Sequence, residues 1–102
     1  MQLTITSDNQ TVTGRIEGRF DTAASVPFAQ DMEPLLAQAD KTIILDCQAL
    51  EFISSSGLRH FLTIRKAAQA KGGKVIICNA SDNVKHVFDL TGFTALFEFE
   101  TR

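Results

Sequence analysis

The sequence predicts an α/β fold: one domain, spanning residues 1–102, with a mixed β-sheet and helices packed on it. The chain has 102 residues, of which 44% are hydrophobic, and this size and composition suit a single core. Two short, apolar, β-branched segments, KTIILDC at 41–47 and KVIIC at 74–78, enclose a segment with helical periodicity. A strand–helix–strand unit of this length forms a right-handed crossover, so we expect these two strands to be parallel.

The first twenty residues predict a pair of strands joined by a hairpin turn. Leu3 and Ile5 alternate with threonines, and the polar segment SDNQ follows. Val12, Ile16 and Phe20 then supply the apolar positions of a second strand. Alternation of this kind around a polar turn is typical of antiparallel neighbours.

Residues 22–40 change to a helical period. The apolar residues that share one helical face are Phe28, Ala29, Met32, Leu35, Leu36 and Ala39. Ser25 is a candidate cap, with Pro27 in the first turn. Pro34 falls in the interior, where a proline costs roughly 3 kcal/mol. We therefore expect a kink or a break near Glu33.

A second helix is expected over Gly57–Lys71, with Gly72 and Gly73 as its stop. Its expected inner face consists of Leu58, Phe61, Leu62 and Ala68, with Arg65 at the edge of that arc.

A third helix follows the strand at 74–78. Ser81 or Asp82 can cap it, and Gly92 ends it. Its apolar stripe consists of Val84, Val87 and Phe88. The tail FTALFEFE predicts a last strand, with its phenylalanines on one side and its glutamates on the other.

The net charge and hydropathy of the chain argue against several classes of protein. A formal net charge of −2 argues against general affinity for nucleic-acid backbones. No run of about 18 apolar residues is present, so we expect no membrane insertion. The N-terminus MQLTITSDNQ lacks the pattern of a signal peptide. These features predict a cytoplasmic protein that acts on other proteins or on small molecules.

Two cysteines, Cys47 and Cys78, each end an apolar segment. We expect them to be buried thiols at strand ends, because nothing else in the sequence suggests an exported, disulfide-bonded protein. No closely spaced pair of cysteine or histidine ligands indicates a metal site.

The segment FISSSGLRHFL, residues 52–62, carries three consecutive serines at the start of the second helix. One interpretation is helix capping, in which a serine oxygen accepts a free backbone N–H and contributes about 1 kcal/mol. The other is a hydroxyl displayed for phosphorylation, since the N-terminal end of a helix favours an anion. One serine suffices for capping, and the sequence alone leaves both interpretations open. Arg59 lies close enough along the chain to meet a phosphate.

Three segments together resemble a known family. They are GRIEGRFDTAASVPF, TIILDCQALEFISSSGLRHFL and GGKVIICNASDNVKHVFDLTGFTALFEF, which occur in order and span residues 14–99. The ordered set resembles the STAS domain family, the small anti-sigma factor antagonists of bacteria. No single segment is specific, but the combination covers nearly the whole chain.

The resemblance implies a role in transcription regulation by partner switching. The unmodified antagonist would bind an anti-sigma factor that is also an ATP-dependent GHKL-type serine kinase. Phosphorylation would abolish that binding, and a serine phosphatase would restore it. ATP would belong to the kinase, so this chain would need no cofactor of its own.

The resemblance also implies site residues. The phosphoacceptor position falls on Ser55, and Ser54 stands where the family often has aspartate, which makes Ser54 the alternative acceptor. The expected partner-binding residues are Asp21, Ser54, Ser56, Gly57, Leu58 and Arg59.

Two rival functions remain. A serine hydrolase is disfavoured, because His60 would lie about 140° around the helix from Ser55 and no base is defined nearby. We therefore expect the chain not to be an enzyme. The other rival is an accessory subunit of a membrane transporter, such as a lipid-transport ATPase, without a phosphorylation switch.

Overall fold

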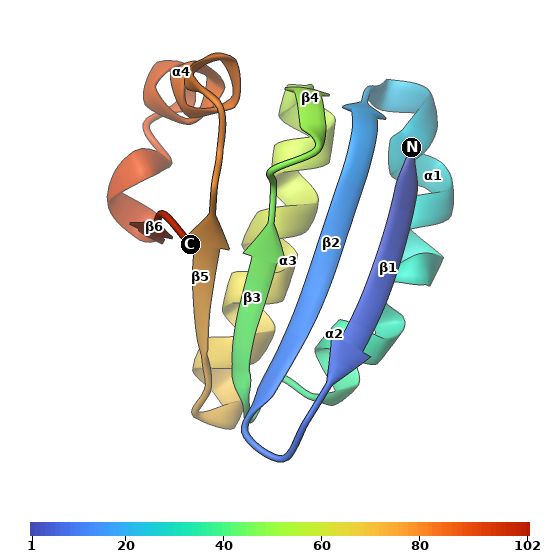
Figure 1. The fold of residues 1–102 in the computed structure, drawn as a ribbon, viewed down its shortest axis with the longest axis vertical. Coiled ribbons are helices and arrows are strands. Elements are labelled where there is room, and N and C mark those ends of the chain that lie inside the picture. Colours follow the sequence, from blue (N-terminus) through green and yellow to red (C-terminus); the bar gives the residue numbers. More distant parts are fainter.

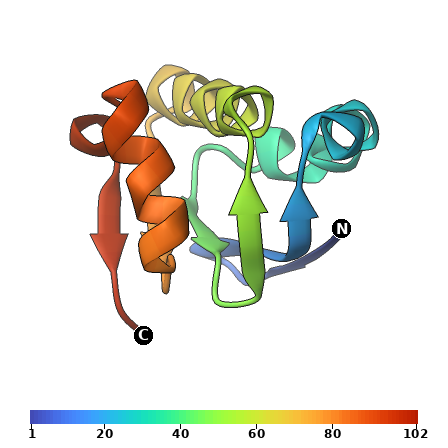
Figure 2. The ribbon, with the colours of Figure 1, turned by 90° about the horizontal axis from the view of Figure 1, so that it is seen from above.

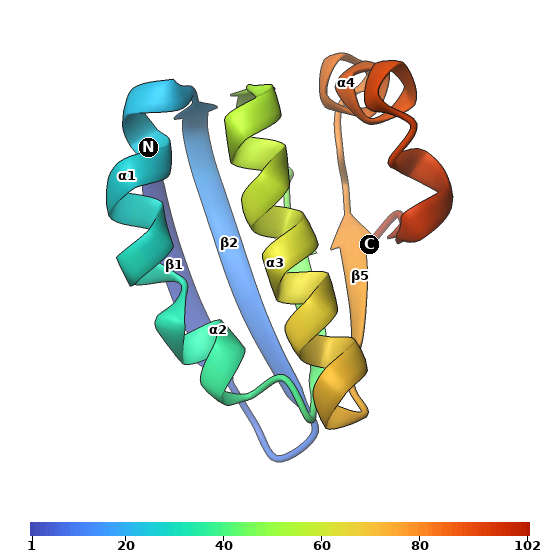
Figure 3. The ribbon, with the colours of Figure 1, turned by 180° about the vertical axis from the view of Figure 1, so that it is seen from behind.

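A six-stranded mixed sheet carries helices α1, α2 and α3 on one of its faces (Figures 1, 2 and 3). This computed structural model describes residues 1–102. The elements in chain order are β1 (Gln2–Ser7), β2 (Thr11–Phe20), α1 (Thr22–Asp31), α2 (Glu33–Ala37), β3 (Thr42–Asp46), β4 (Leu50–Ile53), α3 (Ser55–Lys71), β5 (Lys74–Cys78), α4 (Asp82–Thr91), the 3-10 helix η1 (Thr94–Leu96) and β6 (Glu98–Glu100). The predicted α/β fold is confirmed.

The N-terminal hairpin is confirmed, because β1 and β2 pair antiparallel with Leu3 opposite Ile16. The turn between them is held by the Asp8 carboxylate, which accepts hydrogen bonds from the N–H groups of Gln10 and Thr11, both at 2.8 Å. These two bonds hold the pKa of Asp8 below its usual value.

The parallel crossover is also confirmed. β3 and β5 are adjacent and parallel, with Thr42 opposite Lys74, and α3 is the connecting helix. α3 begins two residues earlier than the sequence predicted, at Ser55, and ends where Gly72 adopts a left-handed conformation with φ of 82°.

Strand β4 was not predicted. β2 is long enough to pair with two strands. Its first half pairs with β3, and its end pairs with β4 from Gly18 onward, with a register shift between Gly18 and Arg19. Both pairings are parallel, so β2 and β4 finish at the same edge of the sheet, with Phe20 opposite Ile53. This second pairing brings the start of α1 beside the start of α3.

The break predicted near Glu33 is confirmed, because α1 ends at Asp31 and α2 starts at Glu33. The predicted start of the first helix is wrong. Asp21, not Ser25, is the cap: its carboxylate accepts a hydrogen bond of 2.9 Å from the Ala24 N–H. α1 therefore starts earlier, and Pro27 lies inside the helix in its second turn rather than in the first.

The core lies between the sheet and its helices. Leu58, Phe61 and Ala68 of α3 are buried as predicted, whereas Leu62 is half-buried and Ile64 is fully buried. The buried face of α3 is therefore rotated slightly from the predicted one, away from Leu62 and Arg65 and toward Ile64. Arg65 is half-exposed.

The C-terminal helix is confirmed, but the predicted last strand is only partly so: Thr94–Leu96 forms the 3-10 helix η1, and the strand is confined to Glu98–Glu100. Ser81 caps α4, Gly92 ends it, and Phe97 is buried while Glu98 and Glu100 are exposed. Phe88 of α4 packs edge-on against Phe97 and Phe99, with ring centroids 5.6 Å and 5.2 Å apart. These contacts hold α4 to the end of the chain.

Both cysteines are free and buried, as expected. Burial raises the pKa of the Cys47 thiol to about 12 and also raises the pKa of Cys78. No helix combines the length and apolarity that crossing a membrane requires.

Gly72 and Gly73, which connect α3 to β5, allow a test of the local packing. A Cβ on Gly73 would lie 2.1 Å from the Ala39 carbonyl oxygen and 2.3 Å from that of Lys41. We expect Gly73→Ala to lower the free energy of unfolding by more than about 3 kcal/mol in urea titrations, because only the backbone can move to relieve the clash. Gly72→Ala meets nothing within 4 Å and loses stability only through its left-handed φ, about 1 kcal/mol. Equal losses for the two variants would contradict the close backbone approach at Gly73.

Candidate functional site

The starts of α1 and α3 lie side by side at the edge where β2 and β4 end (Figure 3). The Ser54 N–H donates a hydrogen bond of 2.8 Å to the Phe20 carbonyl oxygen. This bond continues the pairing of β2 with β4 by one step. Asp21 and Ser54, the two helix caps, therefore lie at the same edge of the sheet.

Ser54 caps α3. Its hydroxyl accepts a hydrogen bond of 3.1 Å from the Gly57 N–H, and its carbonyl oxygen accepts one of 2.9 Å from the Leu58 N–H. The capping interpretation therefore holds for Ser54, the first of the three serines. No other serine is needed for that role.

Ser56 joins α3 to α1. Its Oγ lies 2.9 Å from the Ser54 Oγ and accepts a hydrogen bond of 3.3 Å from the Ser25 hydroxyl. It also donates a long hydrogen bond of 3.5 Å to the Thr22 Oγ1. Ser56 is half-buried, so its hydroxyl is part of the contact between the two helices.

Ser25, which the sequence suggested as a helix cap, is instead part of the serine cluster. It is 9% exposed, and it is the one buried polar side chain of the chain. Its spacing from Phe28 and Met32, three and seven residues, places it on the core face of α1. A buried hydroxyl needs a hydrogen-bond partner. A serine on the core face of a predicted helix is therefore the feature of the sequence that would have identified Ser25 as a site residue.

Ser55 differs from both neighbours. It is exposed, and every hydrogen bond in the cluster is made by Ser54, Ser56 or residues of α1. It is the first residue of α3, a helix of 17 residues, where backbone N–H groups have no intrahelical partner. The helix dipole places partial positive charge at this point.

The remaining predicted site residues divide into two groups. Asp21 and Arg59 are exposed, and Arg59 lies one helical turn after Ser55, on the same face of α3. Gly57 and Leu58 are buried. A Cβ on Gly57 would lie 2.8 Å from the Phe20 ring, so this glycine allows the close approach of α3 to β2. Gly57 and Leu58 therefore support the surface from below.

His60 is engaged in aromatic packing. Its ring stacks on Phe20 with centroids 6.0 Å apart and an interplanar angle of 9°, and it lies 5.5 Å from the Phe28 ring. It points toward α1 rather than toward the Ser55 hydroxyl, in agreement with its angular position on the helix.

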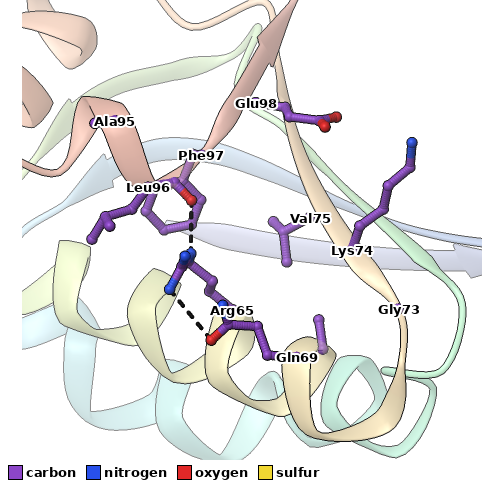
Figure 4. A pocket seen from close by; sticks show the side chains of 10 residues that line it. Arg65, Gln69, Gly73, Lys74, Val75, Ala95, Leu96, Phe97 and Glu98 are labelled. Carbon is purple, nitrogen blue, oxygen red and sulfur yellow. Dashed lines mark hydrogen bonds between the residues drawn. The ribbon is translucent and has the colours of Figure 1, made fainter.

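A cavity of about 260 Å³ lies far from the serine cluster, between the second half of α3, the start of β5 and the segment after α4 (Figure 4). Arg65, which lines the cavity, donates a hydrogen bond of 2.7 Å to the Leu96 carbonyl oxygen. Lys74 and Glu98 also line the cavity (Figure 4). Arg65 is ten residues beyond Ser55, about 15 Å along the helix, so the cavity is separate from the cluster.

Comparison with known proteins agrees with this architecture. Residues 2–102 match the family model described as the STAS domain. The chain is 25% identical over 97 residues to BtrV of Bordetella bronchiseptica, named as a candidate anti-sigma factor antagonist, with 95% of this chain and 84% of BtrV covered.

The fold also matches solved structures of the anti-sigma factor antagonist SpoIIAA at 24% identity. The unphosphorylated form gives a TM-score of 0.79 and covers 96% of this chain and 87% of SpoIIAA. The phosphorylated form of this Bacillus protein gives a TM-score of 0.72, covering 96% of this chain and 90% of that one. The fold is thus that of anti-sigma factor antagonists, and the chain belongs to the STAS domain family.

Proposed function

We propose that the chain is an anti-sigma factor antagonist controlled by phosphorylation of Ser55. Unmodified, it binds an anti-sigma factor that is also a GHKL-type serine kinase. The kinase transfers the γ-phosphoryl group of ATP to the Ser55 oxygen, which releases ADP and the hydroxyl proton. The modified chain no longer binds, and a serine phosphatase restores it. The observation that carries this proposal is that Ser55 has the exposed, unengaged hydroxyl among three adjacent serines.

The arrangement favours Ser55 over Ser54 as the acceptor. A kinase needs a hydroxyl that it can reach and whose modification the fold tolerates. Modifying Ser54 would break the cap on α3, which is worth about 1 kcal/mol. Modifying Ser56 would force a doubly charged group between α1 and α3.

A phosphate on Ser55 would leave the fold intact. It would add about 1.5 to 2 negative charges where unpaired N–H groups and the helix dipole favour an anion. Arg59, one turn along the helix, places a guanidinium on the same face. The new charge and bulk would therefore act mainly on a protein that docks over the loop.

The relatives support the same proposal. BtrV carries the name of an antagonist, and SpoIIAA is known in unphosphorylated and phosphorylated forms. The alternative role as a transporter subunit makes no use of the free Ser55 hydroxyl.

Substitutions at Ser54 and Ser55 should differ in their effect on the free energy of unfolding. Ser54→Ala should lower the free energy of unfolding by about 1 kcal/mol, because the Gly57 N–H loses its acceptor. Ser54→Asp should keep the cap, and Ser55→Ala should change stability by less than about 0.5 kcal/mol. Urea titration of the purified variants measures these differences. A larger loss for Ser55→Ala than for Ser54→Ala would reverse the assigned roles.

Incubation with the cognate kinase and ATP should add one phosphoryl group, which intact-mass spectrometry detects. Ser55→Ala should eliminate the added mass. Ser54→Asp is the matched control, because it retains the cap and removes the neighbouring hydroxyl, and it should still be modified. Phosphorylation that survives in Ser55→Ala would refute the assignment.

Ser55→Asp should weaken binding to the same kinase at least tenfold, as judged by calorimetric titration, because it places a charge in the centre of the docking surface. Its melting temperature should match that of the unmodified chain or exceed it, since an acidic side chain is favourable in the first turn of a helix. Collapse of the fold in this variant would show that the loop is structural.

A further inference from the structure

The two edges of the sheet differ in how they are protected against pairing with another strand. β1 and β6 are the outermost strands (Figure 1). β6 has three residues, and the exposed Glu98 and Glu100 place charges along it. Short length and charge are two of the features that keep an edge strand from pairing with a further chain.

β1 has neither feature. It is six residues long, and its sequence QLTITS contains no charged residue and no proline. Its register with β2 runs without a bulge, from Gln2 opposite Glu17 to Ser7 opposite Val12. β1 is therefore a regular, uncharged edge strand, of the kind that pairs readily with another strand.

The backbone groups of β1 point alternately toward β2 and away from the sheet. The Asp8 N–H donates a hydrogen bond of 2.9 Å to the Thr11 carbonyl oxygen, so these two residues form a hydrogen-bonded pair at the turn. Along an antiparallel ladder, hydrogen-bonded and non-hydrogen-bonded pairs alternate. The N–H and C=O groups of Leu3, Ile5 and Ser7 therefore face outward, and no hydrogen bond outside the β1–β2 ladder reaches them.

These outward groups are arranged symmetrically about Ile5. When a second copy of β1 lies antiparallel with Ile5 opposite Ile5, Leu3 of each copy is opposite Ser7 of the other, and every outward donor and acceptor has a partner. A shift of the register in either direction leaves outward groups unpaired. On the helix side of the sheet, the half-buried Leu3 and Ile5 side chains gain further cover. On the other side Thr4 lies opposite Thr6, a favourable cross-strand pair.

We propose that two copies of this chain associate through β1, in an antiparallel and two-fold symmetric pairing centred on Ile5. A second copy suits this edge because no like charges face each other when two identical β1 strands meet. α1 starts just after the end of β2, beside the beginning of β1. Because the paired strands run in opposite directions, the two α1 helices lie at opposite ends of the contact. β1 takes no part in the hydrogen bonds of the serine cluster, so this inference is independent of the proposed function.

Sedimentation velocity of the full chain at increasing concentration tests the association. The contact involves one strand of each copy, which is small for a protein interface, so we expect a dissociation constant of about 10 to 500 µM. The measured mass should rise from that of the monomer, 11.2 kDa, toward twice that value. A chain that keeps the monomer mass up to about 1 mM would overturn the inference and leave the β1 edge to a strand of another protein.

Two double variants test the register, and each is the matched control of the other. Thr4→Glu with Thr6→Glu places glutamate opposite glutamate in both symmetric contacts, and should weaken the dimer by about tenfold or more. Thr4→Glu with Thr6→Lys places glutamate opposite lysine, and should dimerise within about threefold of the unmodified chain or more tightly. Both positions are exposed, so both variants should fold, which thermal melting of dilute samples checks. Equal weakening in the two variants would contradict the pairing centred on Ile5.

Amide hydrogen exchange locates the contact without any substitution. The amides of Leu3, Ile5 and Ser7 should exchange more slowly as the concentration of the chain rises, because only the second copy accepts their hydrogen bonds. The amides of Thr4 and Thr6 bond to β2 in the single chain, so their exchange should depend much less on concentration. Association that leaves the first three amides unprotected would place the contact elsewhere and overturn the inference.

Discussion

The hydrogen bond from the Gly57 N–H to the Ser54 hydroxyl determines the roles of the other two serines. It fixes Ser54 as the cap and so makes Ser55 the first residue of α3 and Ser56 the second. Side chains of successive helical residues point about 100° apart. Ser56 therefore turns toward α1 and finds the hydroxyls of Ser25 and Thr22, whereas Ser55 turns away from both helices into solvent. The three serine side chains therefore have three different environments, and the difference follows from the hydrogen bond that caps α3.

That cap depends in turn on the length of β2. Because β2 continues past β3 and pairs with β4, the strand leading to α3 ends opposite Phe20, and the Ser54 N–H bonds to the Phe20 carbonyl oxygen. Below the loop, Gly57 lies against the Phe20 ring, and Leu58 and Phe61 fill the core. The base of the loop is thus closely packed, while its exposed edge carries Ser55 and Arg59, with the exposed Asp21 at the neighbouring start of α1. A charge added at that edge meets solvent and a favourable dipole rather than the core.

Local patterns were sufficient to predict most of the fold. Alternation identified the hairpin, and β-branched segments identified β3 and β5. Periodicity with glycine stops identified α3 and α4. β4 was missed because its four residues alternate poorly and its partner is the distant end of β2. The error at α1 has a local cause: Pro27 suggested a first turn, whereas Asp21 supplies the stronger cap and starts the helix earlier.

The site was predictable only in outline. The residue pattern identified the serine cluster and its helix but did not distinguish the three hydroxyls, and the assignment of Ser55 came from the resemblance to the STAS family alone. The distinction among the hydroxyls depends on where β4 ends, which is a tertiary contact. Ser25 was missed for a related reason, since a serine in a helix is exposed in most proteins and here is buried by the neighbouring helix.

The most direct test of this account compares amide NMR spectra of the unmodified chain and of the chain carrying phosphoserine at position 55. The account predicts chemical-shift changes confined to the first turn of α3, the adjacent start of α1 and Arg59, with amides of β3 and β5 unchanged. Shifts that spread through the sheet would show that the phosphate rearranges the core, and they would contradict the claim that the modification alters only the surface.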